Sequence, residues 1–244
     1  SEGEIYLAFV HDIFGHWTIS KGRVEESEDV QAGAIREIKE EMNLEKVPWH
    51  ENAYYIDDNS KKKDCFVFDP VSLVPCLVLK PEKNDRILDM CAAPGTKTFI
   101  ICFLTNNKPR IIANDIDRIR IRRLASNVNK FGLNCEIKNV SGRKIEGSFN
   151  KILLDAPCSG EGMVNKKEKL FRHWSEKRVK IFSSKQKKLI KHAFEMLEEG
   201  GILVYSTCTF EPEENECVID FLLQKNKNAE LEEIKLDIKH VCGL

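Results

Sequence analysis

The sequence lacks the features that mark membrane, secreted and zinc-binding proteins. No apolar run approaches the roughly 20 residues that a membrane-spanning helix needs, and the N-terminus lacks the pattern of a targeting segment. The nine cysteines include no Cys-x-x-Cys pair and no His/Cys cluster with zinc spacing. Without a signal peptide, these cysteines do not indicate a secreted disulfide framework. We therefore expect a cytoplasmic protein with reduced thiols and no membrane segment.

Charge is balanced overall but unevenly distributed. The 244 residues contain 38 Lys and Arg against 39 Asp and Glu, and are enough for one large domain or two small ones. Residues 166–191 contain eleven Lys or Arg against two Glu, whereas residues 25–45 contain eight acidic residues. This asymmetry indicates a polyanion near one surface and a metal near another. Solvated helix faces would give the same pattern and remain the alternative.

Residues 87–98 indicate a nucleotide-type site, because an apolar run breaks into small residues and then resumes as a predicted helix. Ala92, Ala93 and Gly95 would let the backbone approach a ligand closely, and the helix start offers free N–H groups to a carboxylate. S-adenosylmethionine, a nucleoside that carries a carboxylate, would suit this loop. An ordinary strand-to-helix turn is the alternative, since a short glycine-containing loop is a weak signal.

Strands and helices alternate from residue 86 onward. We predict, in chain order, strand 86–90, helix 98–104, strand 110–115, helix 116–131, strands 134–140 and 150–155, helix 176–197 and strand 201–206. This order is typical of an α/β fold with a doubly wound, mainly parallel sheet. Ligands of such sheets lie beyond the carboxyl ends of the strands.

Three side chains are expected at that edge. Asp115 closes the second predicted strand, where an acid commonly accepts hydrogen bonds from ribose hydroxyls; its alternative role is the N-cap of the following helix. Cys158 and Cys208 follow the fourth and fifth strands. A thiolate is suited to conjugate addition, and nearby cations lower its pKa. Buried cysteines are also common as small apolar residues, which is the alternative for either one.

Residues 1–57 show a different pattern. Residues 5–10 have the composition of a strand, residues 12–21 are predicted as a loop, and a helix is expected from about residue 29 to 42. Its carboxylates Glu37, Glu40 and Glu41 share one helical face. Because hard divalent ions prefer oxygen ligands, this face is a candidate Mg²⁺ site.

Gly22, Glu28 and the run from Arg36 to Leu44 resemble the Nudix box. That family implies hydrolysis of a nucleoside diphosphate linked to another group, with Mg²⁺ on the three helix glutamates. The resemblance covers only about residues 4–55, which is too little sheet to enclose the helix. We expect a truncated Nudix-like α+β segment, with retained hydrolase or nucleotide-binding activity as the alternative. A polar linker at residues 58–68 leads to the second domain, residues 69–244.

Several motifs occur in order between residues 69 and 223. They are Asp-Met-Cys-Ala-Ala-Pro-Gly-Thr-Lys-Thr from residue 89, Asp-Ala-Pro-Cys-Ser-Gly-Glu-Gly from 155, His-Trp-Ser from 173, and Tyr-Ser-Thr-Cys-Thr from 205, followed by Pro-Glu-Glu-Asn-Glu from 212. Together they resemble the Nol/Nop/Sun family of RNA cytosine-5 methyltransferases. The resemblance implies a Rossmann-like class I fold, S-adenosylmethionine as cofactor, and rRNA or tRNA as substrate. Sheets of this class usually end in a terminal β-hairpin, and we expect no such hairpin before Leu244.

The resemblance also implies roles for individual residues. Cys208 would add to C6 of cytosine so that C5 attacks the methyl group of S-adenosylmethionine, and Cys158 would assist release. Asp155 and Lys97 match residues of the family's site, where a carboxyl contact to the cytosine edge would stabilise charge on the ring. The candidate cofactor-binding residues are Cys91, Ala92, Ala93, Pro94, Gly95, Thr96, Lys97, Asp115, Ser141 and Asp155.

The basic stretch follows the Cys158 loop, so we expect its cations to contact RNA phosphates. The candidates are Lys166, Lys167, Lys169, Arg172, Lys177 and Arg178. Three other classes of protein stay open: a DNA cytosine methyltransferase, a Nudix hydrolase, and a catalytically inactive RNA-binding module. The second cysteine motif favours RNA over DNA. The sequence indicates neither an oligomeric state nor a choice between rRNA and tRNA.

Overall fold

The computed structural model describes four short strands between residues 7 and 55, and residues 70–160 and 174–234. The chain divides into two compact units, residues 1–74 with 237–239 and residues 75–236 with 240–244. Several predictions fall outside the described residues. These are the helix over residues 29–42, the metal candidates Glu37, Glu40 and Glu41, and the RNA candidates Lys166, Lys167, Lys169 and Arg172.

The first unit contains a small mixed sheet in the order β2-β1-β4-β3. Its strands are β1 (Leu7–His11), β2 (Trp17–Lys21), β3 (Glu45–Lys46) and β4 (Ala53–Tyr55). The strand expected near residues 5–10 is present as β1. The expected loop over residues 12–21 is wrong for residues 17–21, which pair antiparallel with β1 as β2. Trp, Thr and Ile favour strands, and this preference outweighs the turn signal of the preceding residues.

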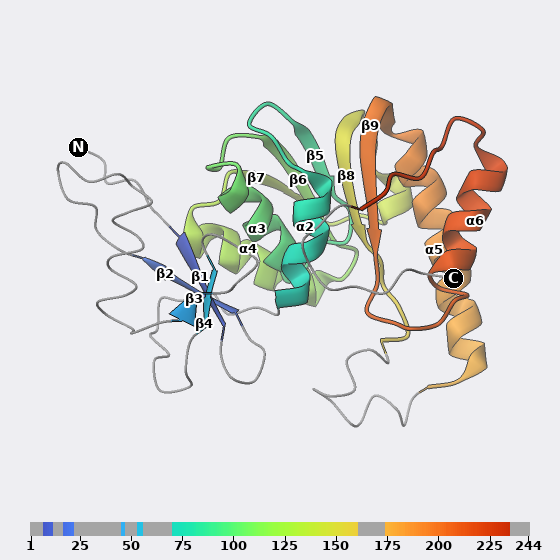
Figure 1. Ribbon diagram of the computed structural model, residues 1–244, viewed down its shortest axis with the longest axis horizontal. Coiled ribbons are helices and arrows are strands. Elements are labelled where there is room, and N and C mark those ends of the chain that lie inside the picture. Colours follow the sequence, from blue (N-terminus) through green and yellow to red (C-terminus); the bar gives the residue numbers. More distant parts are fainter. Residues whose placement is uncertain are drawn as a thin grey trace. The chain divides into compact units, whose positions relative to one another are not determined.

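The second unit is built on a sheet of five strands in the order β7-β6-β5-β8-β9 (Figure 1). The strands are β5 (Arg86–Asp89), β6 (Arg110–Asn114), β7 (Cys135–Lys138), β8 (Phe149–Asp155) and β9 (Leu197–Ser206). Every neighbouring pair is parallel, so the carboxyl ends of all five strands lie at one edge. The predicted doubly wound α/β fold is confirmed for this unit.

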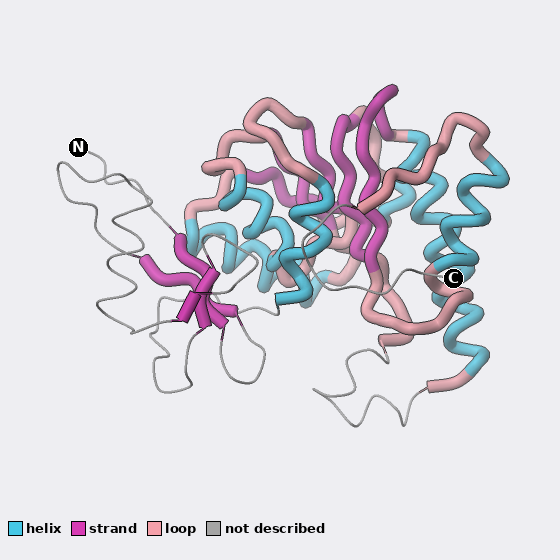
Figure 2. The backbone as a smooth tube through the Cα atoms, in the orientation of Figure 1, coloured by secondary structure: helices cyan, strands magenta, loops and turns pink. Residues whose placement is uncertain are grey.

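Helices cover both faces of this sheet (Figure 2). On one face α4 (Arg118–Phe131) packs Leu124 and Val128 against Ala113 of β6. On the other face α5 (Glu176–Glu195) and α6 (Glu216–Lys225) contribute Ile190 and Leu222 to a cluster with Ile152 of β8. Burial on both faces explains the nearly continuous apolar runs of the strands. Within the residues that the structure describes, no helix is long and apolar enough to cross a membrane.

The helices α2 (Leu73–Leu79) and α6 were not predicted. The α2 sequence is apolar throughout, so a helical period cannot be recognised in it, although Leu73, Cys76 and Leu79 form its buried face. Its proline lies in the first turn, where a missing N–H costs nothing. In α6, Val218 and Leu222 are buried one turn apart. The sequence contains this helical spacing, but over too short a segment to predict the helix. The predicted ends of the other elements differ by a few residues.

Asp89 ends the central strand in an entirely buried position. Its Oδ2 accepts a hydrogen bond of 2.7 Å from the hydroxyl of Thr98 in α3 (Thr96–Leu104), while its Oδ1 has no hydrogen-bond partner among the described residues. Burial disfavours the charged form and raises the pKa of Asp89 from 3.8 to about 7. This carboxyl therefore binds a proton more readily in the folded than in the unfolded chain.

Replacement of this carboxyl should change how stability depends on pH. Because the pKa of Asp89 is raised in the folded chain, its favourable contribution to the free energy of unfolding is complete below about pH 4. This contribution is lost as pH rises to about 7. Asp89→Asn removes the titration at nearly constant volume. The difference in free energy of unfolding, variant minus wild type, should therefore increase with pH by up to about 1.4 kcal/mol per pH unit over this window. Urea unfolding across this range measures the difference, and parallel pH profiles would contradict the expectation.

Candidate active site

The loop between β5 and α3 forms the first part of the site. Gly95 is the N-cap of α3 in a left-handed conformation with φ of 105°. A Cβ atom added at this position would lie 2.6 Å from Cδ1 of Leu124 in α4, so glycine is required by conformation and by space. A glycine N-cap provides no side-chain acceptor, which leaves the first N–H groups of α3 to an anionic ligand.

Asp115, directly after β6, ties this loop to the start of α4. The carboxylate is 3% exposed. It accepts hydrogen bonds from Ala93 N at 3.2 Å and Asp117 N at 2.9 Å, and it lies 3.3 Å from a guanidinium nitrogen of Arg120. The N-cap of α4 is Asp117, which accepts from Ile119 N and Arg120 N, so the alternative role of Asp115 as that cap is wrong. A carboxylate accepts about four hydrogen bonds, and Asp115 retains capacity for a ligand.

Lys97 and Asp155 form an ion pair next to this loop. Lys97 Nζ in α3 lies 2.7 Å from Oδ2 of Asp155, the last residue of β8. The other carboxylate oxygen accepts from the Ser206 hydroxyl of β9 at 2.8 Å. Burial alone would lower the pKa of Lys97, but the Asp155 carboxylate outweighs it and raises that pKa, so the lysine stays cationic. The Asp155 side chain remains 35% exposed and can contact a ligand.

The structure brings the two predicted cysteines together beyond β8 and β9. Cys158 Sγ and Cys208 Sγ lie 3.1 Å apart as free thiols, and the Cys208 backbone N–H donates to Cys158 Sγ at 3.3 Å. A Cβ added at Gly160 would lie 3.9 Å from Cys208 Sγ, in ordinary contact. Parallel strands in register place both turns at one edge, as the sequence predicted for these two positions.

The two thiols differ in acidity. The hydrogen bond from Cys158 lowers the pKa of Cys208 more than burial and the Asp155 carboxylate raise it, and Lys97 adds to the lowering. The same hydrogen bond, followed by burial, raises the pKa of Cys158. The two shifts therefore favour ionisation of Cys208 over ionisation of Cys158. This is the order of acidity that a nucleophilic role of Cys208 requires.

Four other predicted site residues, Cys91, Ser141, Lys177 and Arg178, lie among the described residues. Ser141 precedes a 3₁₀ turn beyond β7 and is partly exposed. Lys177 is exposed at the start of α5, whereas Arg178 stacks its guanidinium 5.3 Å from the Phe182 ring centroid. Cys91 lies in the β5–α3 loop and its pKa is raised, chiefly by burial.

Sequence reasoning gave no role to a set of buried polar residues behind the two cysteines. These are Ser159, Gln186, Thr209 and Glu214. Three of them, Ser159, Thr209 and Glu214, lie in motifs that the sequence shows, but their partners are distant in the chain. Gln186 lies in the middle of α5, where a polar residue on the buried face of an amphipathic helix was the available signal.

Known proteins match both parts of the chain. The family profile described as "16S rRNA methyltransferase RsmB/F" matches residues 76–242, and a NUDIX domain profile matches residues 2–87. The tRNA (cytosine(49)-C(5))-methyltransferase of Pyrococcus abyssi is 40% identical in an alignment of 225 positions that covers 85% of this chain and 72% of that protein. Ribosomal RNA small subunit methyltransferase F of Vibrio vulnificus is 38% identical over 73% of this chain. The chain spans only 42% of that bacterial relative.

Solved structures agree with these matches. The crystal structure of NSun6 from Pyrococcus horikoshii with SFG superposes with a TM-score of 0.63 at 29% identity, over 92% of this chain and 59% of that chain. The profile match over residues 76–242 and the 40% identity to the archaeal relative show that this chain belongs to the RsmB/F family of RNA cytosine-C5 methyltransferases, the Nol/Nop/Sun family that its sequence resembles.

Proposed function

We propose that this chain transfers a methyl group from S-adenosylmethionine to C5 of cytosine in RNA, through a transient covalent bond between Cys208 and C6 of the base. The observation that carries the proposal is the contact of 3.1 Å between the sulfur atoms of Cys158 and Cys208. Family membership supports the reaction type. Relatives named for tRNA and for rRNA both match the chain, so the substrate class is RNA of either kind.

The two thiols have complementary tasks in this reaction. C5 of cytosine is a poor nucleophile, but addition of the Cys208 thiolate at C6 moves electron density to C5. After the new methyl–C5 bond has formed, solvent water takes the C5 proton, the electrons of the C5–H bond re-form the C5–C6 double bond, and the bond between sulfur and C6 breaks. The leaving sulfur regains the negative charge that it had before attack. The Cys158 thiol donates to that sulfur and so assists its release.

Asp155 is placed to contact the base during attack. Lys97 and Ser206 engage both of its oxygens and fix the orientation of the carboxylate before a substrate arrives. A carboxylate accepts from the exocyclic amino group of cytosine, and a fixed acceptor orients the base for attack at C6. Lys97 keeps Asp155 from acting as an isolated negative charge next to the Cys208 thiolate.

The residues present fit S-adenosylmethionine. The uncapped start of α3 suits the carboxylate end of the cofactor, and Asp115 suits its ribose. When bound, the cofactor supplies an electrophilic methyl group. The loop, Asp115 and Lys97 bind and orient it on the same sheet edge as the thiols.

RNA phosphates are proposed to contact the start of α5. One face of this helix lines an open surface hollow of about 680 Å³. Four of its seven lining residues are lysines: Lys177, Lys180, Lys185 and Lys188. Lysines at this density attract a polyanion without reading its bases.

The two thiols should respond differently to replacement. Cys208→Ser should abolish methyl transfer, because the attacking thiolate is lost. Cys158→Ser should permit attack but slow release, so a covalent protein–RNA adduct should accumulate and survive denaturing gel electrophoresis. Cys217→Ser is the control, since Cys217 is a free, exposed cysteine on α6. An adduct formed by the Cys208→Ser variant would reverse the assignment.

The role of Asp115 can be measured without RNA. Loss of hydrogen bonds to a charged group costs about 1.5–3 kcal/mol, so Asp115→Ala should weaken S-adenosylmethionine binding by about tenfold or more. Asp117→Ala is the matched control, because it removes the α4 cap two residues away and leaves the Asp115 side chain in place. Calorimetry compares the affinities. Equal affinity for wild type and Asp115→Ala would limit Asp115 to fixing the loop.

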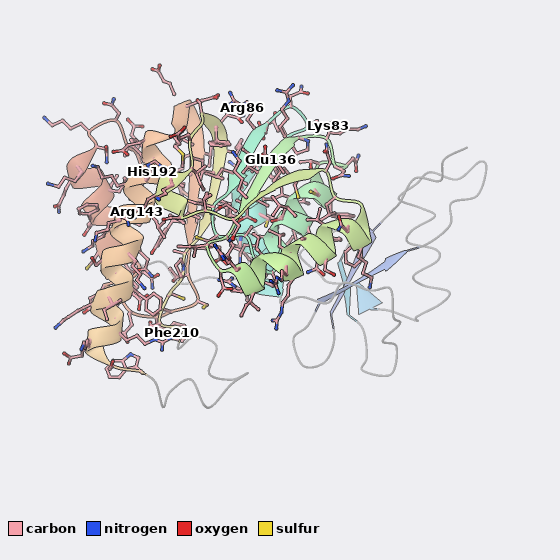
Figure 3. All side chains as sticks on the ribbon, turned by 180° about the vertical axis from the view of Figure 1, so that it is seen from behind. Lys83, Arg86, Glu136, Arg143, His192 and Phe210 are labelled. Carbon is pink, nitrogen blue, oxygen red and sulfur yellow. The ribbon has the colours of Figure 1, made fainter. Side chains whose placement is uncertain are left out.

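The salt dependence of RNA binding tests the basic face of α5. Each phosphate contact with single-stranded RNA contributes about −0.7 to the slope of log affinity against log salt. Lys177→Ala with Lys180→Ala should therefore flatten this slope by roughly 1.4 and weaken all sequences alike. The control pair is Lys83→Ala with Lys108→Ala, since these residues precede β5 and β6 at the amino edge of the sheet. Figure 3 shows Lys83 and Phe210 at opposite ends of the sheet. An unchanged slope in the α5 pair would indicate a solvated face.

A further inference from the structure

Glu214 is a charged residue with no exposed surface. It lies in the turn between β9 and α6, within the Pro-Glu-Glu-Asn-Glu motif that the proposed reaction does not use. A buried carboxylate costs several kcal/mol of desolvation unless other groups compensate for it. Its partners therefore indicate why a charge is retained at this position.

The Glu214 carboxylate accepts hydrogen bonds from two other segments. From the turn after β8, Ser159 donates its backbone N–H to Oε2 at 3.1 Å and its hydroxyl to Oε1. From α5, Gln186 Nε2 donates to Oε2 at 2.7 Å and also reaches the Pro157 carbonyl at 2.9 Å. The residues on both sides of Cys158 are thus connected to one carboxylate, directly or through Gln186.

Oε2 of Glu214 accepts from two N–H groups, whereas the partner of Oε1 is a hydroxyl, which can both donate and accept. A glutamine at position 214 has one acceptor oxygen and no charge, and its NH₂ group can bond the Ser159 hydroxyl only if that hydroxyl no longer donates to residue 214. Replacement of the carboxylate by an amide therefore removes a charge and forces a hydrogen bond to Ser159 to change direction. This distinguishes a built site from a residue that merely fills space.

The next residue, Asn215, contacts the turn that carries Cys208. Asn215 Nδ2 donates to the Thr209 carbonyl at 3.1 Å, and Asn215 Oδ1 accepts from the Thr207 hydroxyl at 2.6 Å. The residues on both sides of Cys208 are therefore bound to Asn215. A hydrogen bond of 3.1 Å between the hydroxyl groups of Ser159 and Thr209 connects the two turns directly.

We propose that Glu214 is a positioning residue that, together with Asn215, sets the distance between the Cys158 and Cys208 turns and so enables the Cys158 thiol to donate to the Cys208 sulfur. Glu214 and Asn215 are consecutive residues of one turn. Glu214 holds the neighbours of Cys158, directly or through Gln186, and Asn215 binds the neighbours of Cys208. The inference rests on the proposed function for its catalytic meaning, but the arrangement of the thiols can be tested without the reaction.

Charge acts in the same direction as geometry. The Glu214 carboxylate contributes to the raised pKa of Cys158, after the Cys208 hydrogen bond and burial. A negative charge behind Cys158 therefore opposes its ionisation and keeps the proton available for Cys208. Loss of Glu214 should reduce the difference in acidity between the two sulfur atoms.

The test compares Glu214→Gln with Glu213→Gln, which changes an exposed carboxylate of the same turn. Iodoacetamide reacts with thiolates, and peptide mass spectrometry resolves the alkylation rate of Cys208 as a function of pH. In Glu214→Gln the pH midpoint for Cys208 should rise by about one unit, equivalent to about tenfold less thiolate below the midpoint. The pH profile of methyl transfer should move in the same direction. Both profiles should be unchanged in Glu213→Gln.

Calorimetric binding of S-adenosylmethionine and thermal unfolding show whether the variant is folded. A folded Glu214→Gln protein with an unchanged alkylation midpoint would overturn the proposal, even if its activity fell. The alkylation profile needs no methyl transfer, so it decides the positioning role independently of the reaction assigned to the chain.

Ser159→Ala provides a second variant should Glu214→Gln fail to fold. It removes the hydroxyl that bonds Glu214 and Thr209 but keeps the backbone N–H bond to the carboxylate. The Cys208 midpoint should then shift upward by less than one unit. An unchanged midpoint in a folded Ser159→Ala protein would also overturn the proposal.

Discussion

The pairing of β8 with β9 is the constraint on which the rest of the site depends. Asp155 pairs with Ser206 in parallel register, so both strands end at the same height. Cys158 lies three residues beyond the first end and Cys208 two residues beyond the second. A slip of the register would separate the sulfur atoms, since each residue advances a strand by about 3.3 Å. Backbone hydrogen bonds of the sheet thus set a distance on which the acidity of a thiol depends.

Buried polar groups support this edge, and three of its carboxylates are bound by donors. Asp155 has Lys97 and Ser206, Asp115 has backbone N–H groups and Arg120, and Glu214 has Ser159 and Gln186. Unsatisfied charges would be costly in a low-dielectric environment. The same bonds that offset this cost restrict the turns, so the site is organised before any ligand binds.

Part of the fold and of the site follows from local patterns. The alternation of apolar strands and amphipathic helices from residue 86 predicted the parallel sheet, and parallel strands implied that Cys158 and Cys208 would share an edge. Local patterns failed where they carried little information. The uniformly apolar α2 has no visible period, and β2 follows a glycine-containing stretch that resembled a loop. The secondary structure of such segments depends on the residues that they contact in the folded chain.

The sequence by itself determined the fold class, the family and the residue types at the catalytic edge, because these are written in periodicity and in contiguous motifs. The tertiary structure decided in which direction the pKa of each cysteine moves and which acids serve as caps, supports or ligand acceptors. Asp115 and Asp117 are two residues apart, yet only Asp117 caps α4. Glu214 and Ser159 are 55 residues apart, yet they form one hydrogen-bonded unit. Such roles depend on distance and burial in space, which a linear pattern does not encode.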